Sequence, residues 1–269
     1  MKDGHVHTPF CPHGSGDSLK SYVERAIALG YTSMTFTEHA PLPNSFIDPV
    51  PDKDSAIALS QMENYLKAID EIKTAYRDDL TILTGLEVDY IQGYEEEIRK
   101  FLDEYGPHLD DSILSVHFLK GETEWHCIDF NPEAFNRASR DLGGVQAIYK
   151  KYYEQVKHSA MADIGKYKPS RIGHISLVRK FHHLYPSPPG WNDMAEEILP
   201  VIKDREMALD YNGAGYKKEH CREPYPPSSI ARKAFDLGIP LVYGSDAHTA
   251  AGLHAGREVM DERLFHSTD

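Results

Sequence analysis

Cysteine is scarce in this sequence of 269 residues. Cys11, Cys127 and Cys221 are the three thiols, and they stand far apart along the chain. An odd number of widely separated cysteines argues against a disulfide framework and against a zinc site built from a CxxC pair. We therefore expect reduced thiols with structural roles.

Long apolar runs are also absent. No run approaches the roughly 20 apolar residues that a helix needs to cross a bilayer. The N-terminal residues Met1–His5 have none of the apolar character that marks an export signal. These two features predict a cytoplasmic protein with no membrane partner.

Positive charge is in short supply. The chain has 29 Lys and Arg against 42 Asp and Glu, so its formal net charge is −13. A general nucleic-acid binder needs a surplus of basic residues to contact phosphate backbones, so we expect no nucleic-acid partner. A small anionic substrate is compatible with this charge if bound metal ions supply positive charge locally.

Linkers rich in Ser and Gly are missing, and so are internal repeats. The length of 269 residues matches a single α/β barrel, which commonly has about 250 residues. Together these features predict one domain that spans residues 1–269.

Short β-rich runs alternate with longer amphipathic runs, which is typical of βα units around a parallel sheet. The predicted strands lie at His5–His7, Ser33–Thr37, Leu80–Thr84, Ser112–Val116, Arg171–Ile175, Met207–Tyr211 and Pro240–Tyr243. The predicted helices lie at Leu19–Leu29, Asp54–Tyr76, Tyr94–Glu104, Val145–Met161, Asp193–Lys203 and Ser228–Leu237. Gly30 suits the end of the first helix, and the stretch after the fourth strand is expected to be irregular as far as Asn131. The pattern predicts a barrel with seven strands in place of the usual eight.

Residues that bind metals recur where the predicted strands end. The motifs are His5-Val6-His7, Glu38-His39, Gly85-Leu86-Glu87, Ser115-Val116-His117, Gly173-His174 and Ser245-Asp246-Ala247-His248. Barrels of βα units place their active sites at the carboxyl ends of the strands. Each motif alone is typical of an ordinary polar strand end, but the whole series predicts that imidazoles and carboxylates meet at a cluster of metal ions.

Two of these motifs have informative spacings. His5 and His7 are two residues apart, so both rings point to the same face of an extended strand. Glu87 follows Gly85, which permits a close backbone approach, and a carboxylate can bridge two cations. Ligands that are mostly imidazoles favour zinc, manganese or iron over calcium.

At this point the residues resemble a known family. The set HxH, TEH, GLE, SVH, GH and GSDAH is similar to that of the polymerase-and-histidinol-phosphatase (PHP) superfamily of metallohydrolases. More narrowly, HTPFCPHG at 7–14, FTEHAPLP at 36–43 and SVHF at 115–118 resemble its histidinol-phosphate phosphatase branch. The resemblance covers His5 to His248. It implies a distorted, TIM-like (β/α)7 barrel with three divalent ions, which would be zinc, iron or manganese.

The resemblance also implies a ligand set. It assigns His5, His7, Glu87 and Asp246 to the first ion; Glu87, His117 and His174 to the second; and His39, His248 and one residue from the loop after the first strand to the third. For that last ligand we favour His13, six residues after His7, over Asp17. Asp17 stands just before a predicted helix and is equally suited to cap it.

Such a site suits phosphomonoester hydrolysis. A hydroxide that bridges two cations is a nucleophile at neutral pH, because bound cations lower the pKa of water from 15.7 towards about 7. In this scheme Glu87 bridges the ions, and Asp246 or His248 donates the proton that the leaving group needs. The substrate implied by the resemblance is histidinol phosphate, with a role in histidine biosynthesis. Two alternatives stay open: a phosphodiesterase or nuclease with the same metal centre, and a metal-poor binding domain without activity.

The residues that bind the substrate are less well marked. The candidate phosphate ligands are Arg222, Lys217 and Arg179, with Lys218 and Lys180 beside them, and the candidate acidic partners of the substrate's cationic groups are Glu38, Asp48 and Asp52. Any of these charges is equally typical of a solvated surface. The oligomeric state is not indicated by the sequence.

Overall fold

Parallel strands surround the centre of the molecule in the order in which they occur along the chain. The structure is a computed structural model that describes residues 1–265. Its seven-stranded sheet consists of β1 (Lys2–Val6), β2 (Ser33–His39), β3 (Thr81–Asp89), β4 (Ile113–Ser115), β7 (Arg171–Ile172), β8 (Ala208–Asn212) and β9 (Leu241–Gly244). All seven predicted strands are present, although most boundaries differ by a few residues. The predicted domain of 1–269 includes residues 266–269, which lie outside the described range.

The first strand and the segment after the last strand close the sheet. The His7 backbone N–H donates to the Ala247 carbonyl at 3.0 Å, and the Asp246 N–H donates to the His5 carbonyl at 2.8 Å. Val6 and Ala247 form an isolated parallel bridge there. The predicted (β/α)7 barrel is therefore confirmed, and its very short strands β4 and β7 account for the distortion.

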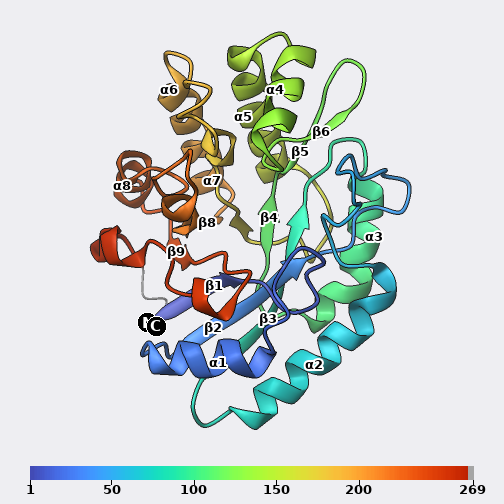
Figure 1. The fold of residues 1–269 in the computed structure, drawn as a ribbon, viewed down its shortest axis with the longest axis vertical. Helices are drawn as coiled ribbons and strands as arrows, with labels where there is room; N and C mark the ends of the chain where they lie inside the picture. The colour runs from blue at the N-terminus through green and yellow to red at the C-terminus, as the bar shows by residue number, and fades with distance from the viewer. Residues whose placement is uncertain (266–269) are drawn as a thin grey trace.

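Helices cover the outside of the barrel (Figure 1). They are α1 (Leu19–Ala28), α2 (Met62–Ala75), α3 (Glu95–Tyr105), α4 (Pro132–Asp141), α5 (Val145–Met161), α6 (Trp191–Glu196), α7 (Leu199–Asp204) and α8 (Ser228–Asp236). In α2, Met62, Tyr65 and Ile69 are buried at helical spacing. The Tyr65 hydroxyl donates to the Phe36 and Gly85 carbonyls at 3.1 and 2.7 Å, which ties the helix to β2 and β3. Within the described residues, no helix combines the length and apolarity that membrane crossing requires.

Local chemistry sets both ends of α1: Gly30 follows its end as expected, whereas Ser18 caps its start in place of Asp17. The Ser18 side chain accepts from the Ser21 N–H at the start of the helix. Gly30, with φ +81°, follows its end in the left-handed conformation that glycine adopts readily.

Two predicted helices differ in the structure. The helix predicted from Asp54 begins only at Met62, because the Asp48 carboxylate accepts hydrogen bonds from the Ser55 N–H at 3.1 Å and the Ser55 hydroxyl at 3.0 Å and holds that segment as a loop. The helix predicted over 193–203 is split into α6 and α7. Pro200 accounts for the split, since its ring would clash with the carbonyl four residues earlier, and α6 ends at that residue, Glu196.

The stretch predicted to be irregular contains regular elements. A hairpin of β5 (Phe118–Lys120) and β6 (Trp125–Cys127) follows β4, and α4 comes next. The Asn131 side chain accepts from the Ala134 N–H at 2.7 Å, and Pro132 takes the first helical position. This start signal was present in the sequence and was missed.

Candidate metal centre

The Glu87 carboxylate lies where the strand-end motifs meet. It is 1% exposed, and the register places Glu87 beside His39 on β2. One oxygen, Oε2, lies 3.2 Å from His5 Nε2 and 3.3 Å from His39 Nδ1. The other, Oε1, lies 2.8 Å from His174 Nε2 and 3.7 Å from His117 Nε2. The fold thus brings the scattered motifs to one buried carboxylate.

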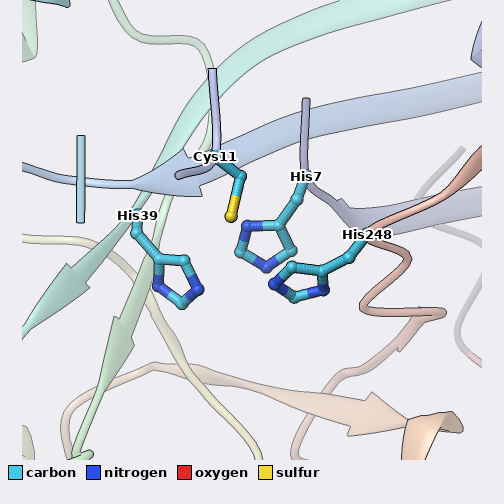
Figure 2. A group of neighbouring side chains, drawn as sticks. All are labelled: His7, Cys11, His39 and His248. Atoms are coloured by element: carbon cyan, nitrogen blue, oxygen red, sulfur yellow. The ribbon is translucent and has the colours of Figure 1, made fainter. Parts of the chain in front are cut away.

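Several groups of side chains at this point could each hold an ion. In each group, the potential ligand atoms lie within 4.8 Å of one another: His5, His7 and Glu87; Glu87, His117 and His174; His39, Asp89 and His117; His7, Cys11, His39 and His248. Figure 2 shows the last group, in which the side chains converge from separate segments of the chain. The overlap of the groups at His7, His39, Glu87 and His117 fits a centre with several ions that share ligands.

Three histidine nitrogens near Glu87 lack a hydrogen bond, although His39 Nδ1 lies 3.3 Å from Glu87 Oε2 and His7 Nε2 lies 3.2 Å from Asp246 Oδ1. His7 Nε2, His39 Nδ1 and His174 Nδ1 are buried and make no hydrogen bond within the described part of the chain. Buried polar atoms without a hydrogen bond are costly, and native structures rarely keep them unless a water or an ion binds there. These nitrogens therefore fit a metal centre.

A second layer of carboxylates orients the histidines. His5 Nδ1 lies 2.8 Å from Asp210 Oδ2, His7 Nδ1 lies 3.2 Å from Glu38 Oε1, and His117 Nδ1 lies 2.8 Å from Asp89 Oδ1. A carboxylate behind a histidine fixes its tautomer and raises its basicity as a ligand. Each of these rings can therefore turn its Nε2 towards an ion.

Sequence reasoning missed this layer. Asp89 stands two residues after Glu87 on the same strand. Asp210 is the last residue but one of the predicted strand Met207–Tyr211, to which no motif was assigned. Glu38 was a candidate partner of the substrate, but its side chain is fully buried and accepts hydrogen bonds from the Thr8 and His39 N–H groups. Asp48 accepts a hydrogen bond from the Val50 N–H within its own loop, and Asp52 is exposed.

The loop after β1 carries the two candidates for the last ligand. The ring of His13 lies 5.2 Å from that of His39 and 5.1 Å from that of His248, and its Nδ1 lies 2.7 Å from the Asp54 carbonyl oxygen. Asp17 does not cap α1, because Ser18 does. The Asp17 Oδ2 atom instead accepts from the Ala250 N–H at 2.9 Å.

Comparison with known proteins places this centre in a family. A PHP domain matches residues 3–214. The chain belongs to the PHP domain family, in its histidinol-phosphatase branch. It is 46% identical to the histidinol-phosphatase of Bacillus subtilis over 97% of this chain and 98% of that protein. It is 34% identical to the probable histidinol-phosphatase of Deinococcus radiodurans, over 91% of this chain and 85% of that protein.

Solved structures share the fold of this PHP domain. A candidate histidinol phosphatase from Listeria monocytogenes superposes with a TM-score of 0.92 at 39% identity, covering 96% of this chain and 99% of that one. The histidinol phosphate phosphatase of Lactococcus lactis, solved with zinc, L-histidinol and phosphate, has a TM-score of 0.72 at 20% identity, over 98% and 94% of the two chains. The family and the ligand groups together imply that the PHP domain binds divalent metal ions.

Charges within the PHP centre compensate one another. Burial alone would raise the pKa of the Glu87 carboxyl, but the adjacent His5, His39 and His117 lower it well below its usual range. Burial would likewise raise the pKa of Asp246, which His5 and His7 lower strongly. Both carboxylates are therefore anionic at neutral pH, as metal ligands must be.

Asp246 and His248 stand where the barrel closes. Asp246 has a φ of +52°, and its Oδ1 lies 3.2 Å from His7 Nε2 and 3.7 Å from His5 Nε2. The His248 ring stacks on that of His7 at 3.9 Å. Burial, followed by the charge of His7, lowers the pKa of His248 to about 3, so its ring is neutral and free to bind a cation.

A cavity of about 920 Å³ opens above this centre. Lys180, Lys217 and Lys218 line it together with the metal-binding groups, whereas the residues that line it do not include Arg179 or Arg222. Arg179 donates to Glu223 Oε1 at 2.6 Å and packs 3.6 Å over the Trp191 ring, and Arg222 is exposed. Of the five sequence candidates for phosphate binding, the structure brings Lys180, Lys217 and Lys218 to the cavity and leaves Arg179 and Arg222 outside its lining.

Proposed function

We propose that this chain hydrolyses L-histidinol phosphate to L-histidinol and phosphate with the help of metal ions. The observation that carries the proposal is the buried Glu87 carboxylate, which is surrounded by histidines at the floor of a cavity. Membership of the histidinol-phosphatase branch supports the choice of substrate. A role in histidine biosynthesis and a cytoplasmic location follow from this activity and stay predictions.

We further propose that the centre holds three ions, drawn from zinc, iron and manganese. His5, His7, Glu87 and Asp246 would hold the first; Glu87, His117 and His174 the second; His39, His248 and His13 the third. The ligand groups support the second set and three members of the first. Asp246, the fourth member of the first set, lies 3.2 Å from His7 Nε2 and 3.7 Å from His5 Nε2 through its Oδ1. For the third, the distances between the rings of His13, His39 and His248 favour His13 over Asp17.

Bound divalent ions would supply a water of lowered pKa and positive charge for the phosphate oxygens. The protein contributes orientation, because the carboxylates of Asp210, Glu38 and Asp89 hold the ligand rings in place. Asp246 is anionic and His248 is neutral at neutral pH. Either would therefore pass a proton to the departing alkoxide only after it had accepted that proton from the attacking water. Both line the cavity, so either can reach a leaving group there.

Parallel assays test this function. Metal-loaded protein should release phosphate from histidinol phosphate much faster than from p-nitrophenyl phosphate, and it should leave a dinucleotide intact. Faster cleavage of the dinucleotide would favour a nuclease. If the protein neither binds metal nor turns over any of the three compounds, the chain is a binding domain.

A further inference from the structure

Two lysines stand together on the wall of the cavity. Lys180 follows the short helix after β7, and Lys218 follows β8, so the barrel brings together residues that are far apart in the sequence. The pKa of Lys218 is lowered, first by the charge of Lys180 and then by burial. Two ammonium groups that line one cavity, Lys180 half-buried and Lys218 exposed, make a site for an anion.

These lysines also lie close to the metal centre. Lys180 and Lys218 line the same cavity as the proposed metal ligands Glu87, His117 and Asp246. Asp129, which holds Lys180, lines that cavity too. An anion bound by the lysines would therefore be next to the proposed ions.

Asp129 fixes the position of the Lys180 ammonium group. The Lys180 ammonium donates to Asp129 Oδ2 at 3.0 Å, and both side chains are 19% exposed. The Cys127 thiol donates to the other oxygen of Asp129 at 3.3 Å. An ammonium has three donors, so this pair leaves Lys180 with two hydrogens for a ligand.

The other cations near the centre are less suited to this role. Arg179 is held by Glu223 and Ser187. Lys217 and Lys218 are both exposed, but the Lys217 ammonium lies 3.3 Å from Glu258 Oε1 and forms an ion pair with it. Lys218, by contrast, forms no ion pair with any of the described residues, so its charge is available to a substrate.

We propose that Lys180 and Lys218 hold the phosphate group of the substrate against the metal centre, and that Asp129 positions Lys180. This inference rests on the proposed phosphatase function. Both lysines come from loops at the carboxyl ends of strands, where barrels bind their substrates. A phosphomonoester dianion carries enough charge to interact with both of them and with the ions.

The test compares Lys180→Gln and Lys218→Gln with two references. Lys100→Gln changes an exposed lysine on α3 that pairs with Glu96, and Lys217→Gln changes the candidate favoured by the sequence. The readouts are the inhibition constant of inorganic phosphate, kcat/KM for histidinol phosphate and for p-nitrophenyl phosphate, and metal content. Losing a charged hydrogen bond should raise the inhibition constant about 10- to 100-fold in K180Q and K218Q. kcat/KM should fall similarly for both substrates, because they share the phosphate, and metal content should stay as in the wild type.

Three outcomes overturn the proposal: inhibition constants in K180Q and K218Q that match that of K100Q, a larger effect in K217Q than in K218Q, or a loss of metal that accounts for the change. If the wild type does not hydrolyse histidinol phosphate, the proposed function fails. Calorimetric titration of the metal-loaded variants with inorganic phosphate then still decides the role of the lysines.

Asp129 is tested in a double-mutant cycle. Asp129→Asn should weaken phosphate binding in the wild-type background, but it should have no further effect in K180Q, because its role acts through Lys180. Equal effects in both backgrounds would show that Asp129 does not act by positioning that lysine.

Discussion

At the residue scale, a single carboxylate organises the site. Glu87 is almost fully buried and has histidines next to both of its oxygens. Water therefore cannot stabilise the negative charge of its carboxylate. A buried anion of this kind requires positive charge nearby. Protonated imidazoles can supply that charge, but they cannot bind a metal. Divalent ions held by neutral imidazoles supply the positive charge and keep the rings as ligands.

Replacement of Glu87 by Gln should remove the bridge between ions. The amide has the size of the carboxylate but not its charge, so we expect the variant to lose at least one ion and its turnover to fall by about 10³-fold or more. Elemental analysis and phosphate-release assays measure both effects. Glu63→Gln, an exposed position on α2, is the control. An E87Q protein with a full metal complement would contradict the proposed bridge.

Replacement of Asp210 by Asn tests the layer behind the ligands. His5 would lose the carboxylate that lies 2.8 Å from its Nδ1, and metal affinity should fall about 10- to 100-fold. Competition with a chromogenic chelator gives the affinity. Asp236→Asn, on the exposed side of α8, should match the wild type. Equal affinities in the two variants would rule out this role for Asp210.

At the element scale, the sequence predicts strands better than the segments between them. Short β-rich runs alternate with longer amphipathic runs, and this alternation is sufficient to locate the barrel strands. Each strand is a short apolar run that ends in polar residues. The predicted start of α2 is too early because side-chain contacts decide where the helix begins. Ser55 donates hydrogen bonds to the Asp48 carboxylate, and the spacing of apolar residues along the sequence does not reveal that contact. The carboxylates behind the histidines were overlooked for the same reason, since their burial follows from barrel closure.

Gly85 shows how an element positions the centre. A Cβ atom at this position would lie 2.2 Å from the Asp111 carbonyl oxygen, so β3 can approach the entry to β4 only with glycine there. Gly85→Ala should therefore cost about 1–3 kcal/mol of unfolding free energy and displace Glu87, two residues later. Urea unfolding and metal content measure these effects.

Gly16→Ala is the matched control, because a Cβ atom at position 16 meets nothing within 4 Å. Its stability should stay close to that of the wild type. If G85A and G16A unfold at the same urea concentration, the close approach of β3 to β4 does not limit this fold.

At the scale of the whole molecule, metal binding and folding should be coupled. The ligands come from segments between His5 and His248, so the site exists only when the barrel is closed, as it is between β1 and the segment after β9. Ions that bind the folded chain but not the unfolded chain stabilise it by mass action, by about 2.7 kcal/mol at 100 times the dissociation constant.

Removal of the ions by a chelator should therefore lower the melting temperature. For a protein of this size, about 2.7 kcal/mol corresponds to roughly 5–10 °C. Addition of zinc or manganese should restore the original value, and the same treatment should shift E87Q less, because that variant starts with fewer ions. Calorimetric melting curves recorded with parallel metal analysis check this. If the metal-free protein melts at the temperature of the loaded one, the histidines and acids of the barrel are stable without ions, and hydrogen bonds alone would then explain why they converge.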